Sequence, residues 1–319
     1  MKKQIFVKDI TEQLSSINDV FVVTKKDMFA KKDNTKYISL LLSDRTGSIE
    51  GRIWERVEEL NGYFEKYDIV SVQASLQRYQ DRLQLNIKDI RTLDEELTLE
   101  HMKAFYPESK RGTEELKQEF FDCVREIRNP YIRSLFNALH NQQEIQERLF
   151  LFPASIGIHH TYISGLLEHS LTMARIGKVV VDISGGDRDI VIAGCLLHDI
   201  GKIDEITIRG GFKYSDKGRL IGHIGLGIIR LEACIRTIND FPPYISDVLT
   251  HIIISHHGME EWGSPRKPMC VEALIVHYID NLDAKVSGVK EHMEKNMEDE
   301  RWTDYHRLYE SRFYKIPEG

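Results

Sequence analysis

DRDIVIAGCLLHDIGK, residues 187–202, carries the strongest structural signal in this chain of 319 residues. Its apolar residues run almost without interruption up to His198, and this pattern indicates a buried helix. The helix ends in two strongly polar neighbours, His198 and Asp199, after which Gly201 permits a sharp exit. Because polar groups that close a buried helix must be paired or bound to something, the stretch predicts a polar site inside a helical domain.

Further histidine and aspartate residues surround this stretch at intervals typical of successive helices. Taken alone, His169 lies beside an apolar stripe and has the pattern of a packed core residue. The series as a whole changes that interpretation, because it continues with His223, His256, His257 and Asp280. Mixed imidazole and carboxylate ligands can hold a pair of divalent metals, with Asp199 as a bridge that lets both act on one phosphate. The second half of the chain therefore predicts a phosphoester hydrolase.

Composition narrows the class of protein. The chain has a formal net charge of −7 and no apolar run that reaches the roughly 18 residues of a membrane span. Its start, MKKQIFVKDITEQ, has the charges of a signal peptide without the apolar region that follows them. The four cysteines are widely spaced and form no Cys-x-x-Cys pair, which argues against a zinc ribbon and a disulfide framework. We therefore expect a cytoplasmic protein of two domains with no membrane segment and with reduced core thiols.

The first third of the chain has the pattern of a β-rich domain. Five apolar and β-branched runs, separated by turn-forming residues, predict strands at 19–29, 36–44, 48–55, 68–79 and 82–90, with a helix-like insert at 55–67. From about Leu97 the spacing of apolar residues becomes helical and stays so. We therefore predict a small barrel over residues 1–95, a linker over 96–112 and a helical domain over 113–319, with its core at about 155–290.

Two segments of the β-rich region, LLLSDRTGSIEGRIW (40–54) and IVSVQASLQRYQDRLQLNIKDIRTL (69–93), resemble the OB-fold of anticodon-binding and related nucleic-acid-binding domains. Single-strand binders of this kind combine a basic groove with aromatic platforms. Candidates for substrate binding are Lys25, Lys26, Phe29, Lys31, Lys32, Lys36, Tyr37, Arg78, Tyr79 and Arg82. The alternative, in which the lysines form a solvated face and the aromatic rings belong to the core, stays open for each of them.

The order of the motifs in the helical region resembles that of the HD-domain metal-dependent phosphohydrolases, whose pattern is H…HD…D. The extra histidines match the two-metal form, which also occurs in the HD-GYP cyclic-dinucleotide phosphodiesterases. Carried over to this chain, the resemblance implies a first metal held by His169, His198, Asp199 and Asp280, and a second held by Asp199, His223 and His256. Two adjacent helical residues diverge by about 100°, so His257 is assigned to the surroundings of the metals or to the substrate phosphate, with a ligand role left open.

Other polar residues near these motifs are given supporting roles. Lys202 follows Asp199 by one short turn and is expected to neutralise phosphate charge; the alternative is a solvated loop lysine. Asp283 shares a helix face with Asp280 and is expected to orient a ligand or a water. His159 and His160 precede the first ligand helix and are expected to line the cleft, whereas His251 and His277 are expected to be structural.

An all-β OB-fold barrel, a linker and an all-α HD-domain helical bundle with HHTYISGLLEHSL, LLHDIGK and YIDNLDAK together resemble the YhaM family of bacterial 3′–5′ exoribonucleases. The resemblance implies removal of nucleotides from the 3′ end of single-stranded RNA, or also of single-stranded DNA, with Mn²⁺ as the preferred metal over Mg²⁺ or Fe. Polarity and RNA preference come only from this resemblance. Homo-oligomer formation is left open.

Two competing functions remain at this level. One is a cyclic-dinucleotide phosphodiesterase of the HD-GYP type, against which counts the absence of the GYP tripeptide from RGGFKYSDKGR, residues 209–219. The other is a non-catalytic regulator that binds nucleic acid and uses the HD site as a sensor. The apparently complete set of metal ligands argues against this second alternative.

Overall fold

The chain forms two compact units in the computed structural model, which describes residues 3–31, 34–93, 98–156, 162–208, 211–295 and 301–317. The first unit comprises Met1–Glu108 and Ile206–Asp216, and the second comprises Ser109–Glu205 and Lys217–Gly319. The break after Glu108 falls inside the predicted linker. The return of residues 206–216 to the first unit departs from the predicted domain bounds, which assign this segment to the helical domain.

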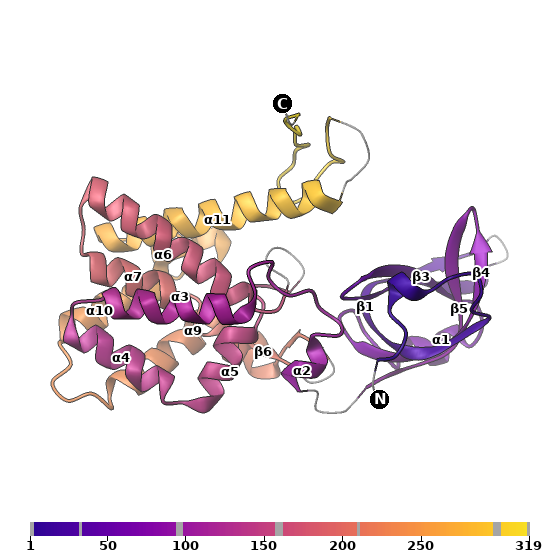
Figure 1. Cartoon of the computed structure of the whole chain (residues 1–319), viewed down its shortest axis with the longest axis horizontal. Coiled ribbons are helices and arrows are strands. Elements are labelled where there is room, and N and C mark those ends of the chain that lie inside the picture. The colour runs from indigo at the N-terminus through magenta and orange to yellow at the C-terminus, as the bar shows by residue number, and fades with distance from the viewer. Residues whose placement is uncertain are drawn as a thin grey trace. The chain divides into compact units, whose positions relative to one another are not determined.

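The first unit is built on a closed five-stranded barrel (Figure 1). Its strands are β1 (Ser16–Ala30), β2 (Lys36–Asp44), β3 (Gly47–Ile53), β4 (Ile69–Tyr79) and β5 (Arg82–Thr92), in the order β1-β2-β3-β5-β4. Strands β3 and β5 pair in parallel and the other neighbours are antiparallel. Short helices precede, interrupt and follow the strands: η1 (Val7–Asp9), α1 (Val57–Asn61) and α2 (Leu99–Met102). The predicted five strands and helical insert are confirmed.

Alternation of side chains along the strands creates the barrel core. In β2, Ile38, Leu40 and Leu42 are buried, while the residues between them are partly exposed. Successive side chains of a strand point to opposite faces, so every second residue reaches the interior. Strand β1 departs from this alternation, because the five residues from Asp19 to Val23 are all buried.

A short hairpin from the middle of the sequence completes the first unit. It consists of β6 (Ile206–Thr207) and β7 (Lys213–Tyr214). The ring of Phe212 packs against Tyr106 with centroids 4.7 Å apart, and Lys213 forms an ion pair with Asp68. These contacts explain why the hairpin belongs with the barrel, although the residues on both sides of it belong to the helical unit.

The second unit is helical, as predicted. Its longer helices are α3 (Thr113–Glu126), α4 (Pro130–His140), α5 (Gln143–Leu151), α6 (Gly165–Ser184), α7 (Arg188–Leu197), α9 (Asp216–Ile235), α10 (Pro243–Ser255) and α11 (Val271–Lys295), with the short α8 (Lys202–Glu205) and η2 (Glu260–Trp262) between them. Helix α7 packs against α6, α10 and α11, and every residue from Ile190 to Leu197 is buried. The side chain of Asp187 caps α7 by accepting from two backbone N–H groups. The buried helix predicted at this place is confirmed.

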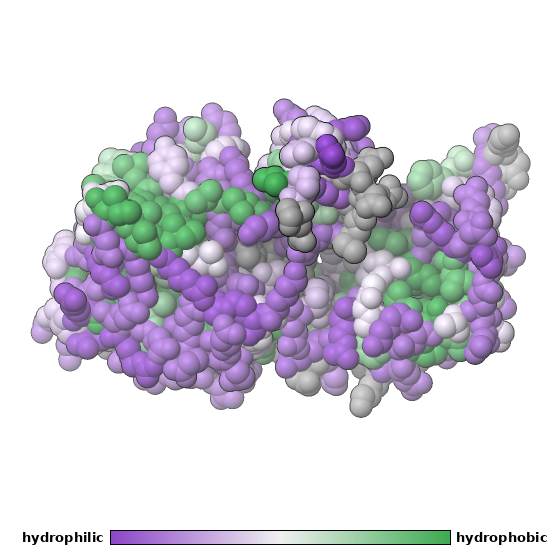
Figure 2. Space-filling view, turned by 45° about the horizontal axis from the view of Figure 1, so that its top comes forward, coloured by the Kyte–Doolittle hydropathy of each residue, from purple (hydrophilic) through white to green (hydrophobic). Residues whose placement is uncertain are grey.

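Polar groups cover much of the face in Figure 2, with an apolar patch on the helical part. Helix α11 contributes exposed apolar side chains at Leu274, Tyr278, Leu282 and Val286, which recur at four-residue spacing and so form one stripe. Among the described helices, none combines the length and the apolar character needed to cross a lipid bilayer. Residues of α11 off this stripe include His277 and Asp280, which face the helical interior.

Candidate metal centre and nucleic-acid interface

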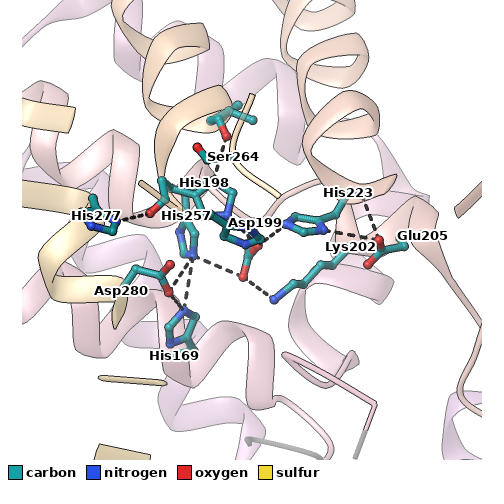
Figure 3. A network of polar contacts seen from close by, with 12 residues as sticks. His169, His198, Asp199, Lys202, Glu205, His223, His257, Ser264, His277 and Asp280 are labelled. Atoms are coloured by element: carbon teal, nitrogen blue, oxygen red, sulfur yellow. Dashed lines mark hydrogen bonds and ion pairs between the residues drawn. The ribbon is translucent and has the colours of Figure 1, made fainter. Parts of the chain in front are cut away.

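The predicted metal ligands converge on one place in the helical unit (Figure 3). Helix α6 brings His169, the end of α7 brings His198 and Asp199, α9 brings His223, the end of α10 brings His256 and His257, and α11 brings Asp280. Six of these residues form two groups whose candidate ligand atoms lie within 4.8 Å of one another. We call His169, His198 and Asp280 the first triad, and His223, His256 and His257 the second triad.

Asp199 lies between the two triads and offers one oxygen to each. Its Oδ2 is 3.2 Å from His198 Nε2 of the first triad. Its Oδ1 is 3.6 Å from His223 Nε2 and 3.7 Å from His256 Nε2 of the second triad. Within the first triad, His169 Nε2 lies 3.2 Å from Asp280 Oδ1. This is the arrangement that a carboxylate bridging two cations requires.

Each of the five histidines presents the same nitrogen to the centre. A carbonyl or carboxylate oxygen accepts from Nδ1 in every case, which leaves the lone pair on Nε2 for a ligand role. The acceptors are Asp283 Oδ2 for His169 (2.6 Å), Cys195 O for His198 (3.0 Å), Glu205 Oε1 for His223 (3.3 Å), Ile253 O for His256 (2.7 Å) and Trp262 O for His257 (2.8 Å). The orientation of the rings is therefore set by their surroundings.

Three polar atoms at the centre lack hydrogen-bond partners among the described residues. They are Asp199 Oδ1, His223 Nε2 and His256 Nε2, and all three are buried. A buried acceptor without a donor is costly, and three acceptors that face one another cannot satisfy each other. A divalent cation satisfies all of them at once. The donor set of imidazole nitrogen and carboxylate oxygen therefore fits two divalent metal ions.

The charges of Asp199 and of two histidines of the second triad agree with this interpretation. Burial and the neighbouring His198 hold the pKa of His256 well below its usual range, and burial with His223 lowers the pKa of His257. Both imidazoles are then neutral and able to ligate. Burial opposes ionisation of Asp199, but Lys202, His198 and His223 together outweigh it and hold the pKa of this carboxyl well below its usual value. A charged carboxylate is thus kept in a buried place.

Close backbone approach brings His223 to Asp199. A Cβ at Gly201 would overlap the carbonyl oxygen of His223, so only glycine lets α9 pass this close to the end of α7. Gly222 adopts φ 74° and interrupts α9 just before His223. The freed backbone N–H of His223 then donates to Glu205 Oε1 at 2.9 Å. The importance of Gly201 was predicted, but its reason is this approach as well as the exit from α7.

Glu205 is a positioning residue that the sequence reasoning missed. It is buried, and its Oε1 accepts from both the backbone and the imidazole of His223. Its position in LLHDIGKIDE offers no periodic signal, because a short helix of four residues has no defined apolar face. Asp283 accepts from His169 Nδ1 at 2.6 Å, and its expected role in orienting a ligand stays a prediction.

The second triad includes His257, whose role was left open. Helix α10 ends at Ser255, and Gly258 adopts φ 77°, so the chain leaves the helix where the two histidines stand. His256 keeps helical dihedrals (φ −62°, ψ −29°), and the centroids of the His256 and His257 rings lie 4.3 Å apart. His277 donates from Nδ1 to the carbonyl of His256 at 2.7 Å, and His251 Nε2 accepts from the backbone of Met269 at 2.8 Å. The structural roles expected of both stay predictions, since His277 also lines the cavity beside the triads.

A cavity of about 670 Å³ opens beside the triads. Its inner lining includes Asp199, Lys202 and Asp280, and Lys202 Nζ is 2.6 Å from Asp199 Oδ2. The outer lining comes from residues that the sequence reasoning did not single out: Trp262, Asn281, Ala284, Lys285, Leu308 and Tyr309. The spacing of YIDNLDAK on one helix could have indicated Asn281 and Lys285, but nothing local indicates Trp262 or Tyr309. His159 and His160 lie outside the described residues.

The barrel carries an aromatic ladder on its outer surface. The rings of Phe29, Tyr37 and Trp54 come from β1, from β2 and from the residue after β3. Phe29 and Tyr37 stack with centroids 5.5 Å apart, and Tyr37 and Trp54 stack at 4.7 Å. Lys31 Nζ lies 4.7 Å from the centre of the Trp54 ring. Phe29 and Tyr37 were predicted, whereas Trp54 was missed, although it follows an alternating strand whose Ile53 points inward.

The basic residues predicted for the barrel surface differ in their surroundings. Lys26 departs from the prediction, because its Nζ donates to the carbonyls of Asn61 (2.9 Å) and Phe64 (2.6 Å), and only 11% of its side chain is exposed.

Lys25 and Lys36 are exposed, in ion pairs with Asp27 and Glu58. At the hairpin between β4 and β5, Arg78 forms ion pairs with Glu12 and Asp81. Tyr79 is exposed and lies opposite Arg82. Lys32 lies outside the described residues.

Comparison with known proteins supports both units. The family model "HD domain" matches residues 166–285, and the "OB-fold nucleic acid binding domain" matches residues 21–93. Among solved structures, the second OB-fold domain of replication protein A from Methanococcus maripaludis is 28% identical, covering 31% of this chain and 100% of its own, with a TM-score of 0.23.

Two relatives match over nearly the whole chain. The 3′–5′ exoribonuclease YhaM of Geobacillus sp. (strain WCH70) is 32% identical over 317 residues, covering 99% of this chain and 95% of the relative. The protein of the same name from Bacillus subtilis (strain 168) is 30% identical, covering 99% of this chain and 98% of the relative. With this identity over nearly the full length of both relatives, this chain belongs to the YhaM family of 3′–5′ exoribonucleases.

Proposed function

We propose that this chain is a metal-dependent 3′–5′ exoribonuclease that hydrolyses single-stranded RNA, and also single-stranded DNA, at a centre of two divalent ions. The observation that carries the proposal is the position of Asp199, with one oxygen toward each triad and a second triad whose buried nitrogens lack donors among the described residues. Two divalent ions bound there supply Lewis-acid chemistry, which activates water and stabilises negative charge on a phosphodiester.

The residues around the triads prepare this chemistry. Glu205 and Asp283 hold the imidazoles of His223 and His169 in one orientation, so that no rotation is needed when a substrate binds. Lys202 lines the cavity next to Asp199 and carries a positive charge that a phosphate oxygen can meet. Fixed charges in a site from which water is largely excluded are the main source of transition-state stabilisation in reactions of this class.

The barrel supports a polymeric substrate. Three stacked rings of the aromatic ladder present flat apolar faces, and the Lys31 ammonium lies over the Trp54 ring; the exposed Lys36 precedes Tyr37 in the sequence. Unpaired bases stack on such faces whatever their identity, and lysines neutralise the phosphates between them. Duplexes hide the faces of their bases, so this surface favours single strands.

Mn²⁺ is the metal that we propose for both positions. Carboxylates suit Mn²⁺ and imidazoles suit Fe, whereas Mg²⁺ prefers a shell made largely of oxygen. The preference for Mn²⁺ over Fe comes from the resemblance to the YhaM family. The centre contains five imidazoles and two carboxylates, Asp199 and Asp280. Metal analysis of the purified protein, followed by removal and return of single metals, tests this order of preference.

The proposed activity is tested with oligonucleotides labelled at the 5′ end. In the presence of Mn²⁺, the protein should shorten single-stranded RNA in steps from the 3′ end, and the same sequence as a duplex should resist. A single-stranded DNA of the same sequence tests whether DNA is also a substrate. Turnover of a cyclic dinucleotide without decay of RNA would favour the HD-GYP type of activity, and tight binding of RNA with no turnover would favour a regulator.

A further inference from the structure

The cavity beside the triads extends well past the metal ligands. Besides the residues of the triads, it is lined by η2, by α11 and by a segment near the end of the described chain. Trp262, Lys285 and Tyr309 come from these three places. A volume of about 670 Å³ lies within the roughly 300–1,000 Å³ typical of pockets that bind small molecules. The cavity therefore has room for more than the phosphate that is cleaved.

Small residues on α11 let the end of the chain form one wall. Ala284 and Gly288 lie four residues apart on the same face, and a Cβ at Gly288 would overlap the hydroxyl of Tyr309. This hydroxyl is 3.5 Å from the carbonyl oxygens of Ala284 and of Lys285, which fixes the ring against the helix. Tyr309 is thus held in a notch that only glycine leaves open.

The terminal segment is itself ordered by contacts within it. Trp302 pairs with Tyr314 as an isolated antiparallel bridge, and His306 pairs with Ser311 in the same way. The ring of Tyr309 also contacts His306, with centroids 4.7 Å apart. The wall of the cavity is therefore a folded loop that holds Tyr309 from both sides.

The side chains that η2 and α11 contribute to the cavity match the chemistry of a nucleotide. Trp262 is 47% exposed, and Lys285 Nζ lies 5.5 Å from the centre of its ring. Flat aromatic faces bind unpaired bases through stacking, and an ammonium beside them binds phosphate. Asn281, on the same face of α11, adds an amide that can donate to or accept from a base or a sugar.

We propose that Trp262 and Tyr309 form a subsite for the base at the 3′ end of the strand, with Lys285 on the neighbouring phosphate. The proposal rests on the proposed exonuclease function and deepens it, because it says how the enzyme holds the end of a strand. The subsite selects for an unpaired terminal base, whose faces are free, and it tolerates any sequence. Tyr309 makes the terminal segment part of the active site.

The test measures whether each side chain affects cleavage through the 3′-terminal base that it is proposed to bind. Two single-stranded RNA oligonucleotides are compared, one complete and one that lacks only the base of its 3′-terminal residue. For the unchanged protein we expect kcat/KM to be about tenfold higher for the complete strand. In Trp262→Ala and Tyr309→Ala this preference should fall to about twofold or less, because the complete strand loses more rate than the strand without the base.

Further variants separate a subsite from a structural role. Trp262→Phe and Tyr309→Phe keep a stacking face and should keep most of the preference. Gly288→Ala favours the helix but displaces Tyr309, so it should lose the preference without loss of folding. Tyr305→Ala is the matched control, because Tyr305 is exposed in the same segment and is not among the residues that line the cavity.

Opposite outcomes overturn the inference. If both alanine variants keep the full preference for the terminal base, or slow both strands equally, the two rings do not bind it. The same strands are also titrated by fluorescence anisotropy with Ca²⁺ in place of Mn²⁺, where the terminal base should strengthen binding to the unchanged protein but not to Trp262→Ala or Tyr309→Ala. If the unchanged protein cleaves neither strand, the proposed function fails, and this titration still decides whether the subsite exists.

Discussion

Asp199 Oδ1 lies 3.7 Å from His256 Nε2, and neither atom has a hydrogen-bond partner within the described parts of the chain. His256 donates from Nδ1 to the carbonyl of Ile253, so its Nε2 carries a lone pair that points at a charged carboxylate. Two acceptors repel in this arrangement unless a cation lies between them. This buried arrangement destabilises the metal-free helical unit and becomes favourable when metal binds.

Asp199→Asn should lose bound metal and abolish hydrolysis. The amide keeps the shape of the side chain but removes the charge shared by the two triads, and its NH₂ group cannot ligate a cation. Metal content measured by plasma mass spectrometry should fall from two ions per chain to one or fewer. Asp182→Asn, at an exposed position on α6, is the control and should keep both ions. Near-normal turnover by folded Asp199→Asn protein would refute the bridging role.

Glu205→Gln should weaken the second triad and spare the first. The neutral amide is a weaker acceptor than the carboxylate for the Nδ1 proton of His223. Loss of a hydrogen-bond partner that orients a metal ligand lowers metal affinity by about 10- to 100-fold. Titration with Mn²⁺ should show one site of unchanged affinity and one that is weaker. A loss of both sites together would indicate that Glu205 acts on the fold and not on His223.

Lys202→Met should lower turnover with metal content unchanged. The side chain lines the cavity 2.6 Å from Asp199, where its charge can meet a phosphate oxygen in the transition state. Preorganised charge of this kind contributes about 3 kcal/mol, which corresponds to on the order of a hundredfold in rate. Lys217→Met, at an exposed position on α9, serves as the control. An unchanged single-turnover rate would remove Lys202 from the reaction and leave it as the partner of Asp199.

The metal-free protein should lose stability as the pH rises. Burial would lower the pKa of His169, but its hydrogen bonds to Asp280 and Asp283 outweigh burial and raise the pKa to about 9. The unfolded chain releases this proton near pH 6.5, so the stabilisation is complete below that pH and is lost as the pH rises through about 9. The free energy of unfolding should fall by on the order of 3 kcal/mol in this window.

Denaturant unfolding in EDTA across this pH window measures the effect. Asp283→Asn removes a carboxylate that raises this pKa, so its free energy of unfolding should depend less on pH over the same range. Bound metal occupies the Nε2 lone pair of His169 and should also flatten the profile. An equal decline in the variant and in the unchanged protein would assign the pH dependence to other groups.

Most of the fold was predictable because its signals are local or periodic. Alternating apolar residues indicated the strands, and the apolar run that ends in His198 indicated the buried helix α7. The hairpin at 206–216 was not predictable as part of the first unit. Its place depends on Phe212 meeting Tyr106 and on Lys213 meeting Asp68, contacts between segments that are more than a hundred residues apart.

The candidate site divides in the same way. Residues whose types are rare in apolar helices, such as His169 and Asp280, could be singled out from the sequence. Glu205, Trp262 and Tyr309 could not, because an exposed glutamate or aromatic ring has the same local pattern as one that serves a site. The place of His257 depended on where α10 ends, and the bounds of helices are the least certain part of any prediction from sequence.

The most direct test of the central claim is a crystal structure of the protein grown with Mn²⁺, with anomalous scattering recorded at the manganese edge. We predict two anomalous peaks in the helical unit, one against the first triad and one against the second, with Asp199 contacting both. A single peak, or two peaks that do not share Asp199, would contradict a two-metal centre bridged by this carboxylate.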